Sequence, residues 1–399
     1  MKRKKLSAVA SLLAGLLLFS HDVALAADST AVSRVFSQLA ATPTLADPSI
    51  IVVDEKTGEV IFQSNANSPR KPASVIKLVS AVAAYTHLSP SDSFTTSLWQ
   101  GIETGTIVIQ GSLDPWISYK HSEATKMGRT SWPRIENKIL SLIQSDTYSA
   151  GIAPIIYYSN LNSPEVNHLK TFLLDRDIKI TLKKVTPTQA RAKAGKYLLA
   201  GSSPTVQEIV DWTLIWSDNL LAERIARLAS RAAGNSFDDK GVAKTFRTLL
   251  SNFGIDTTNL VVKDASGLSK ENRMTAKQVS QLLMIIYHNP QFAPLIESLP
   301  IGGVSGTLQE RFIETAPTAI GLVRAKTGTL NGTTNLAGFV ESGDHQYIFV
   351  VIADRHSKSY TVTKRVRATV DRILGKIANP LLPTLLPIST SSESATASN

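Results

Sequence analysis

The order of predicted strands and helices indicates an α+β fold in which one sheet takes strands from both ends of the chain. Two β-rich runs, at 50–53 and 60–62, lie near the start, and three more, at 321–326, 335–341 and 347–353, lie near the end. In most of the sequence between them, apolar residues recur at the spacing of an α-helix. Strands at both ends of a helical middle favour an α+β arrangement with an antiparallel sheet over alternating β and α units.

The elements before residue 112 follow from local patterns. A short helix is predicted at 32–39, and the acidic, glycine-containing turn at 54–59 joins the first two strands into a hairpin. A helix with an apolar face is predicted over 74–88. Two further strands are predicted at 94–99 and 106–110.

The middle of the chain divides into an irregular part and a helical part. Residues 112–185 show no clear period, and we expect a small inserted subdomain there, within a discontinuous domain formed by 27–111 and 186–378. Residues 204–233 are strongly helical, and Thr205 and Glu208 match a capping box at the start. Later helices are predicted at 242–253, 276–288 and 361–377.

Both ends of the chain have distinctive compositions. Residues 1–26 combine a basic start, a short apolar run and the small residues Ala24 and Ala26, which is typical of a secretory signal peptide. An uncleaved anchor is the alternative, but the apolar run is short for a membrane span. We therefore expect export to the periplasm or the extracellular face of an envelope, with no membrane span after cleavage. Residues 379–399 are rich in Pro, Ser and Thr, and we expect a disordered tail.

Composition excludes several classes of function. The chain has no cysteine, so disulfides, cysteine nucleophiles and thiolate metal sites are excluded. It has no H-E-x-x-H zinc motif and no G-x-S-x-G nucleophile elbow, and we expect no metal and no cofactor. Of the formal charge of +10, about +7 remains after the signal peptide, scattered along the chain, which does not suggest nucleic-acid binding. Oligomeric state is left open.

A serine with a neighbouring lysine base is the remaining candidate for nucleophilic chemistry. On a helix, S-x-x-K places hydroxyl and amine on one face, and burial can lower the lysine pKa enough for it to act as a base. The sequence contains two matches, at 68–71 and 74–77. Pro72 disfavours helix at Lys71, whereas Ser74 and Lys77 open an apolar helix. We therefore select Ser74 and Lys77.

Two later motifs complete a possible site. Ser217, Asp218 and Asn219 interrupt a helical stretch, since all three side chains compete for backbone hydrogen bonds. The run 326–329, Lys-Thr-Gly-Thr, offers a cation and hydroxyls that suit a carboxylate, and a glycine that admits a substrate backbone. A second Lys-Thr-Gly at 56–58 is explained by the first hairpin turn.

These motifs, in this order, are typical of penicillin-binding proteins and class A β-lactamases. The chain resembles the D-alanyl-D-alanine carboxypeptidase/endopeptidase family, the class C low-molecular-mass penicillin-binding proteins. The resemblance implies a serine β-lactamase/penicillin-binding transpeptidase-like fold, with an antiparallel sheet packed against a helical subdomain. It covers most of the mature chain, and the segments that carry it most clearly are 71–78, 264–269, 303–308 and 324–330.

The resemblance also implies a mechanism. Ser74 would form the acyl-enzyme, Lys77 would be its base, and Ser217 would pass a proton to the leaving D-alanine. Backbone N–H groups of Ser74 and Thr329 would form the oxyanion hole. Substrates would be peptidoglycan peptides ending in D-Ala-D-Ala, and β-lactam antibiotics would acylate the same serine.

The same resemblance assigns the binding residues. Asn219 would hold the penultimate amide, Lys326 would supply positive charge, and Thr327 and Thr329 would bind the terminal carboxylate.

Two departures bear on function. Ser74 and Ser217 are only 143 residues apart, so the long insertion usual in the family is expected to be reduced. The motif sequence Ser217-Asp218-Asn219 is typical of class A β-lactamases. However, the E-x-x-L-N loop that carries their deacylating Glu does not occur between Asn219 and Lys326, which argues against a fast β-lactamase. A β-lactamase or related serine esterase or peptidase remains the alternative, and a catalytically silent envelope protein is a third reading.

Overall fold

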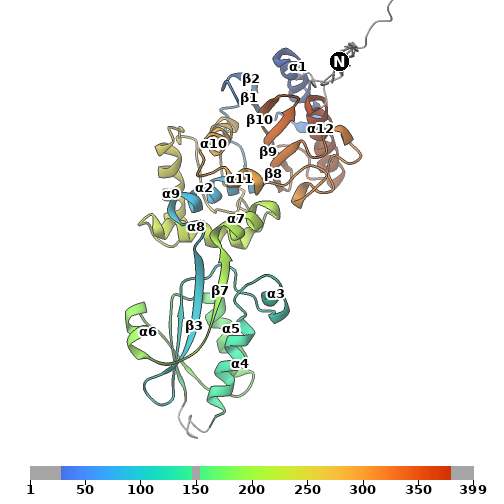
Figure 1. The fold of residues 1–399 in the computed structure, drawn as a ribbon. Coiled ribbons are helices and arrows are strands. Elements are labelled where there is room, and N and C mark those ends of the chain that lie inside the picture. The colour runs from blue at the N-terminus through green and yellow to red at the C-terminus, as the bar shows by residue number, and fades with distance from the viewer. Residues whose placement is uncertain (1–27, 146–152, 379–399) are drawn as a thin grey trace, which may run out of the picture.

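A five-stranded antiparallel sheet joins the two ends of the chain, in the strand order β2-β1-β10-β9-β8 (Figure 1). The computed structural model describes residues 28–145 and 153–378; the predicted signal peptide and tail lie outside them. The strands are β1 (Ser49–Asp54), β2 (Val60–Ser64), β8 (Val323–Leu330), β9 (Thr333–Ser342) and β10 (His345–Ala353). The predicted α+β plan, with an antiparallel sheet built from both ends, is confirmed.

Both faces of this sheet are covered by helices. Alternate residues point to opposite faces of a strand, and in β1 Ile51 packs toward the helical middle of the chain while Ile50 and Val52 pack toward the terminal helices. The terminal helices are α1 (Ser29–Ala40) and α12 (Tyr360–Ala378). Every residue of β1 is buried, so the strand lies inside the core, between β2 and β10.

The helical middle forms the second layer beneath the sheet (Figure 1). Its elements are η2 (Ala73–Ile76), α2 (Lys77–His87), α7 (Val206–Ile215), α8 (Asn219–Ala232), α9 (Asp239–Asn252), α10 (Ala276–His288) and α11 (Pro294–Glu297). The predicted helix over 204–233 is thus two helices, and the predicted capping box of Thr205 and Glu208 is present at the start of α7. Among the described residues, no helix combines the length and the apolar character needed to cross a membrane.

A second lobe extends from the helical layer on the paired strands β3 and β7 (Figure 1). Its sheet is mixed, in the order β6-β5-β4-β3-β7, with β4, β5 and β6 parallel. The strands are β3 (Ser93–Gly101), β4 (Thr106–Gly111), β5 (Ile155–Ser159), β6 (Thr181–Lys184) and β7 (Ala194–Thr205). The helices are α3 (His121–Lys126), α4 (Trp132–Ile143), α5 (Ser163–Leu174) and α6 (Pro187–Lys193).

The second lobe has its own core. Ile107 and Ile109 of β4 pack with α4 and α5 on one face, whereas Val108 between them packs with Ala190 of α6 on the other. This lobe runs from β3 to β7, so it takes in more of the chain than the inserted subdomain predicted at 112–185. The reason is that β3 and β4 carry ordinary strand patterns, and a strand pattern does not reveal which sheet a strand joins.

The second lobe is attached to α8 by buried polar contacts. Arg224 of α8 donates to Pro115 O at 3.1 Å and to Glu165 Oε1 of α5 at 3.1 Å. Glu165 is 0% exposed and also accepts from Tyr119 Oη. Nearby, Asp114 Oδ1 accepts from the backbone N–H of Trp116 at 2.8 Å. Burial, and to a lesser extent the charge of Glu165, raises the pKa of Asp114 to about 6.

This raised pKa predicts a pH-dependent stability. The protonated form of Asp114 is favoured in the folded state, so its contribution is full below the unfolded pKa near 4 and is lost as pH rises through about 6. Asp114→Asn removes this titration. We expect the stability of the variant relative to the original protein to rise between pH 4 and pH 8 by about 2–3 kcal/mol, since a tenfold change in proton affinity is worth about 1.4 kcal/mol. Urea unfolding at both pH values measures this, and a pH-independent difference would contradict it.

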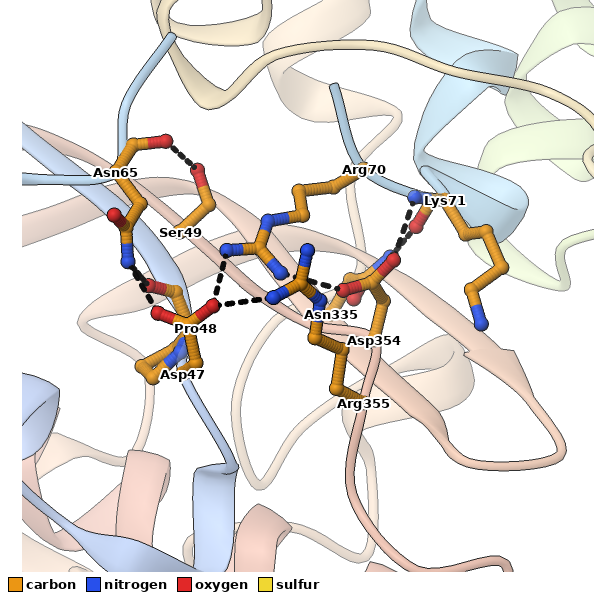
Figure 2. A network of polar contacts seen from close by, with 9 residues as sticks. All are labelled: Asp47, Pro48, Ser49, Asn65, Arg70, Lys71, Asn335, Asp354 and Arg355. Atoms are coloured by element: carbon orange, nitrogen blue, oxygen red, sulfur yellow. Dashed lines mark hydrogen bonds and ion pairs between the residues drawn. The ribbon is translucent and has the colours of Figure 1, made fainter. Parts of the chain in front are cut away.

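A buried arginine fixes the segment that leads into η2 (Figure 2). Arg70 is 2% exposed; its guanidinium bonds Asp47 at 2.9 Å and Asp354 at 3.3 Å. Asp354 also accepts from the backbone N–H of Lys71 at 3.1 Å, and Asn335 donates to the carbonyls of Lys71 and Pro72. The segment before η2 is thus tied to β9 and to the end of β10.

The network also explains the first S-x-x-K match. Arg70 pairs as an isolated β-bridge with Met274, so residues 68–71 are not helical, as predicted. The side chain of Lys71 points away from the carboxylates (Figure 2). The Lys-Thr-Gly at 56–58 lies in the first hairpin turn, where Thr57 donates to Asp54 and Gly58 has φ +72°.

Removing the Arg70 guanidinium should destabilise the protein strongly. Arg70→Met leaves the carboxylate of Asp354, 7% exposed, without its cation, and we expect a loss of about 3–5 kcal/mol in the free energy of unfolding. Arg355 is the matched control, because it also bonds Asp47 but is 58% exposed. Arg355→Met should cost less than about 1 kcal/mol. Equal losses in urea titrations of the two variants would refute the role of the buried pair.

Candidate active site

Ser74 and Lys77 lie on consecutive helical turns and contact each other. Ser74 is in η2, Lys77 is the first residue of α2, and the distance from Lys77 Nζ to Ser74 Oγ is 2.8 Å. The preceding Ala73 has φ +46°, a left-handed conformation that costs a non-glycine residue free energy and occurs often at functional sites. The predicted single helix over 74–88 therefore begins as a 3₁₀ turn, and the pair still shares one face.

The amine of Lys77 is fully buried and has acceptors from three parts of the chain. Besides Ser74 Oγ, it donates to Asn219 Oδ1 at 2.7 Å and to the carbonyl of Ser266. Burial lowers the pKa of Lys77 to about 8, although the negative charges of nearby carboxylates oppose this effect. A lysine with this pKa has about a tenth of its population neutral at pH 7 and is mostly neutral above about pH 8, and the neutral form can accept a proton from a hydroxyl.

The break between α7 and α8 brings two further predicted site residues, Ser217 and Asn219, close to Lys77 and Lys326. Ser217 has φ +60°, and Asp218 caps α8 by accepting from the backbone N–H of Leu221 at 2.9 Å. Asn219 therefore stands at the first position of α8, where its side chain reaches Lys77. The predicted interruption of the helix is confirmed, and its cause is the competition of these short polar side chains with helical bonding.

Strand β8 supplies the other wall. Lys326 is 0% exposed, and its Nζ lies 2.9 Å from Ser217 Oγ. Burial, and then the charge of Lys77, hold the pKa of Lys326 well below its usual range. Thr327 Oγ1 is 2.8 Å from the hydroxyl of Thr307. Gly328 has no room for a side chain, since a Cβ would lie 2.8 Å from the carbonyl of Pro72.

The loop at 264–269 supports Lys77, and its role was not predicted from the sequence. Glu223 Oε1 accepts from the backbone N–H groups of Ala265 at 3.0 Å and Ser266 at 2.8 Å, which directs the Ser266 carbonyl to Lys77. Gly267 has φ +87°, and a Cβ there would lie 2.0 Å from the carbonyl of Ala73. The available signal was spacing: Glu223 follows Asn219 by four residues, on one face of α8.

All the predicted site residues come together around one cleft of about 770 Å³. The volume is within the usual range for ligand sites. Its lining includes Ser74, Ser217, Asn219, Thr327 and Thr329, and the two lysines lie buried behind them. The far wall is formed by residues 310–315 and by α12, neither of which was singled out from the sequence.

Comparisons with known proteins identify relatives of this chain in sequence and in fold. The chain is 29% identical to carboxypeptidase DacB of Mycolicibacterium smegmatis over 336 residues, which cover 72% of each chain. It shares its fold with penicillin-binding protein 4 of Haemophilus influenzae, solved in complex with a β-lactam, at a TM-score of 0.65 and 19% identity, covering 87% of this chain and 98% of that one.

A second solved structure with this fold is a predatory peptidoglycan endopeptidase of Bdellovibrio bacteriovorus. The TM-score is 0.54 at 14% identity, and the match covers 83% of this chain and 93% of that one. A model of the D-Ala-D-Ala carboxypeptidase 3 (S13) family matches residues 32–152 and 165–377. With most of its length matched, this chain belongs to the D-Ala-D-Ala carboxypeptidase 3 (S13) family of peptidases.

Proposed function

We propose that this protein is a serine-type D-Ala-D-Ala carboxypeptidase that trims peptidoglycan stem peptides through a Ser74 acyl-enzyme. The observation that carries the proposal is the 2.8 Å contact between Ser74 Oγ and the buried amine of Lys77. A second hydroxyl–lysine pair, Ser217 and Lys326, lies beside the same cleft. A nucleophile next to a base of lowered pKa is the arrangement that acyl transfer requires.

The geometry supports a two-step reaction. Neutral Lys77 takes the proton of Ser74, whose oxygen attacks the carbonyl of the penultimate D-alanine. Backbone N–H groups of Ser74 and Thr329 stabilise the oxyanion. The peptide C–N bond breaks, Ser217 gives its hydroxyl proton to the departing amine and recovers the proton that Lys77 took from Ser74, and free D-alanine leaves. Water then hydrolyses the Ser74 ester and regenerates the hydroxyl.

Substrate binding uses the remaining predicted residues. Because Asn219 Oδ1 is held by Lys77, its amide nitrogen remains to donate to the backbone of the substrate. Thr327 and Thr329 face the cleft from β8 and offer hydroxyls to the terminal carboxylate, while the buried amine of Lys326 lies behind them. β-Lactams present a comparable carbonyl and carboxylate to the same groups.

Covalent labelling tests the nucleophile. Incubation with benzylpenicillin should add one penicilloyl group, seen by mass spectrometry of the intact protein and mapped to the peptide that contains Ser74. Ser74→Ala should abolish both the adduct and the release of D-alanine from a pentapeptide. Ser68→Ala, in the other S-x-x-K match, is the control and should label normally. A persistent adduct in Ser74→Ala would sink the proposal.

The pH dependence of acylation tests the base. Lys77 must be neutral to act, so the rate should rise with pH to a plateau above about pH 8. The carboxylate of Glu223 raises the pKa of Lys77, so Glu223→Gln should move the midpoint to lower pH. Glu271→Gln, at an exposed carboxylate that pairs with Lys263, should leave the midpoint unchanged. A midpoint that stays the same or rises in Glu223→Gln would count against Lys77 as the base.

Endopeptidase and β-lactamase activity are the two alternative functions, and each is tested with its own substrate. The Bdellovibrio neighbour is a peptidoglycan endopeptidase, which makes cleavage of cross-linked muropeptide dimers a second candidate activity of this site. A β-lactamase would instead turn over penicillin many times per second. Release of D-alanine, of cleaved dimers and of hydrolysed penicillin from one preparation ranks the three activities.

We also infer export to the periplasm or the extracellular face, where such substrates occur. The support is the signal-peptide pattern of residues 1–26, which lie outside the described residues. A mature protein that begins near Ala27 on N-terminal sequencing would agree with this, whereas an intact Met1 would not.

A further inference from the structure

An arginine on the last helix reaches the hydroxyl at the end of the Lys-Thr-Gly-Thr run. Arg367 of α12 donates from Nη2 to Thr329 Oγ1 at 3.2 Å. Both residues line the cleft that contains Ser74. α12 is 19 residues long, and its side chains that line this cleft are Tyr360, Lys364, Arg367, Ala368 and Asp371.

Arg367 makes no direct contact with a carboxylate in the part of the chain that the structure describes. Across residues 28–145 and 153–378 it forms no ion pair. Asp371, one turn further along α12, is engaged by Arg311, whose guanidinium bonds both of its oxygens. Burial, and then the charge of the nearby Arg311, lower the pKa of Arg367, while the charge of Asp371 opposes them from beyond ion-pair distance. An arginine stays protonated nonetheless, so this part of the cleft holds a partly buried cation that no described carboxylate contacts directly.

The proposed reaction places an anion at this end of the cleft. The leaving D-alanine carries its carboxylate one residue beyond the carbonyl that Ser74 attacks, and one residue spans about 3.5 Å. Thr327 and Thr329 are neutral donors. Lys326 is turned inward to Ser217, with its amine fully buried. A guanidinium next to Thr329 can bind a carboxylate through two parallel hydrogen bonds, a geometry that lysine does not offer.

We propose that Arg367, together with Thr329, binds the terminal carboxylate of the leaving residue and makes the site selective for peptides with a free C-terminal acid. This inference rests on the proposed carboxypeptidase function. It assigns to α12 a specificity-determining residue that contacts substrate on the departing side of the scissile bond.

The competing explanation is purely structural: Arg367 could serve only to orient the Thr329 hydroxyl. Arg367→Gln separates the two, because glutamine can donate a hydrogen bond to Thr329 but has no charge. The substrates are a diacetylated Lys-D-Ala-D-Ala tripeptide and its C-terminal amide, which differ only in the terminal carboxylate. Arg365→Ala is the matched control, since Arg365 is exposed on the same helix and is not part of the cleft lining.

We expect the unaltered protein to prefer the acid. A charge-assisted hydrogen-bonded pair is worth about 10- to 100-fold, so Arg367→Gln and Arg367→Ala should lose that factor in kcat/KM on the acid and little on the amide. Arg367→Lys should retain part of the preference, and guanidinium chloride should partly restore Arg367→Ala on the acid alone. Arg365→Ala should behave like the unaltered protein.

Three outcomes would overturn the inference: no preference for the acid in the unaltered protein, equal losses on acid and amide in Arg367→Ala, or normal acid turnover by Arg367→Gln. Each of these leaves the proposed function standing as long as Ser74 is acylated by penicillin and D-alanine is released. Absence of both reactions in the unaltered protein would instead reject the proposed function. Guanidinium rescue and thermal melting of each variant identify losses that come from misfolding.

Discussion

The buried amine of Lys77 is the interaction on which the rest of the site depends. Removing an ammonium group from water is costly unless acceptors replace the lost hydration. Here they come from η2, from the first residue of α8 and from the loop that contains Ser266, three segments far apart in the chain. A shift of any one of them would leave the amine with an unsatisfied donor, so the need to satisfy Lys77 keeps Ser74, Asn219 and the loop in fixed relative positions.

The two buried lysines sit in different electrostatic surroundings. Lys77 has the carboxylates of Asp264, Glu223 and Asp218 near enough to favour its charged form, which limits how far burial lowers its pKa. For Lys326 the neighbouring charge is that of Lys77, which acts in the same direction as burial. Protonation of either amine therefore disfavours protonation of the other. An anionic ligand in the cleft would oppose this repulsion, so substrate binding and proton occupancy are coupled at this site.

The proposed catalytic groups and the groups that support them come from different parts of the fold. The cleft lining comes from η2, the α7–α8 break, β8, β9, α12 and nearby loops, and none of the described residues of the β3–β7 lobe is part of it. That lobe reaches the site through Arg224, on the helix whose first residue is Asn219. The Arg70 network supports the opposite side by tying the segment before Ser74 to the sheet. The contacts of Arg224 and those of Arg70 thus support opposite walls of the cleft.

The sequence by itself determined the fold class, the elements of the main sheet and the seven candidate site residues, since these depend on local periodicity, capping patterns and short motifs. It also distinguished Ser74 from Ser68, because Pro72 acts on its immediate neighbour. The tertiary structure alone decided that β3, β4 and β7 form a sheet with β5 and β6, because the residue pattern of a strand does not specify which other strands it pairs with. It alone decided that Glu223 directs the Ser266 carbonyl and that Arg367 reaches Thr329. These contacts join residues that are 43 and 38 positions apart in the chain, and a local sequence pattern does not predict contacts between residues so far apart.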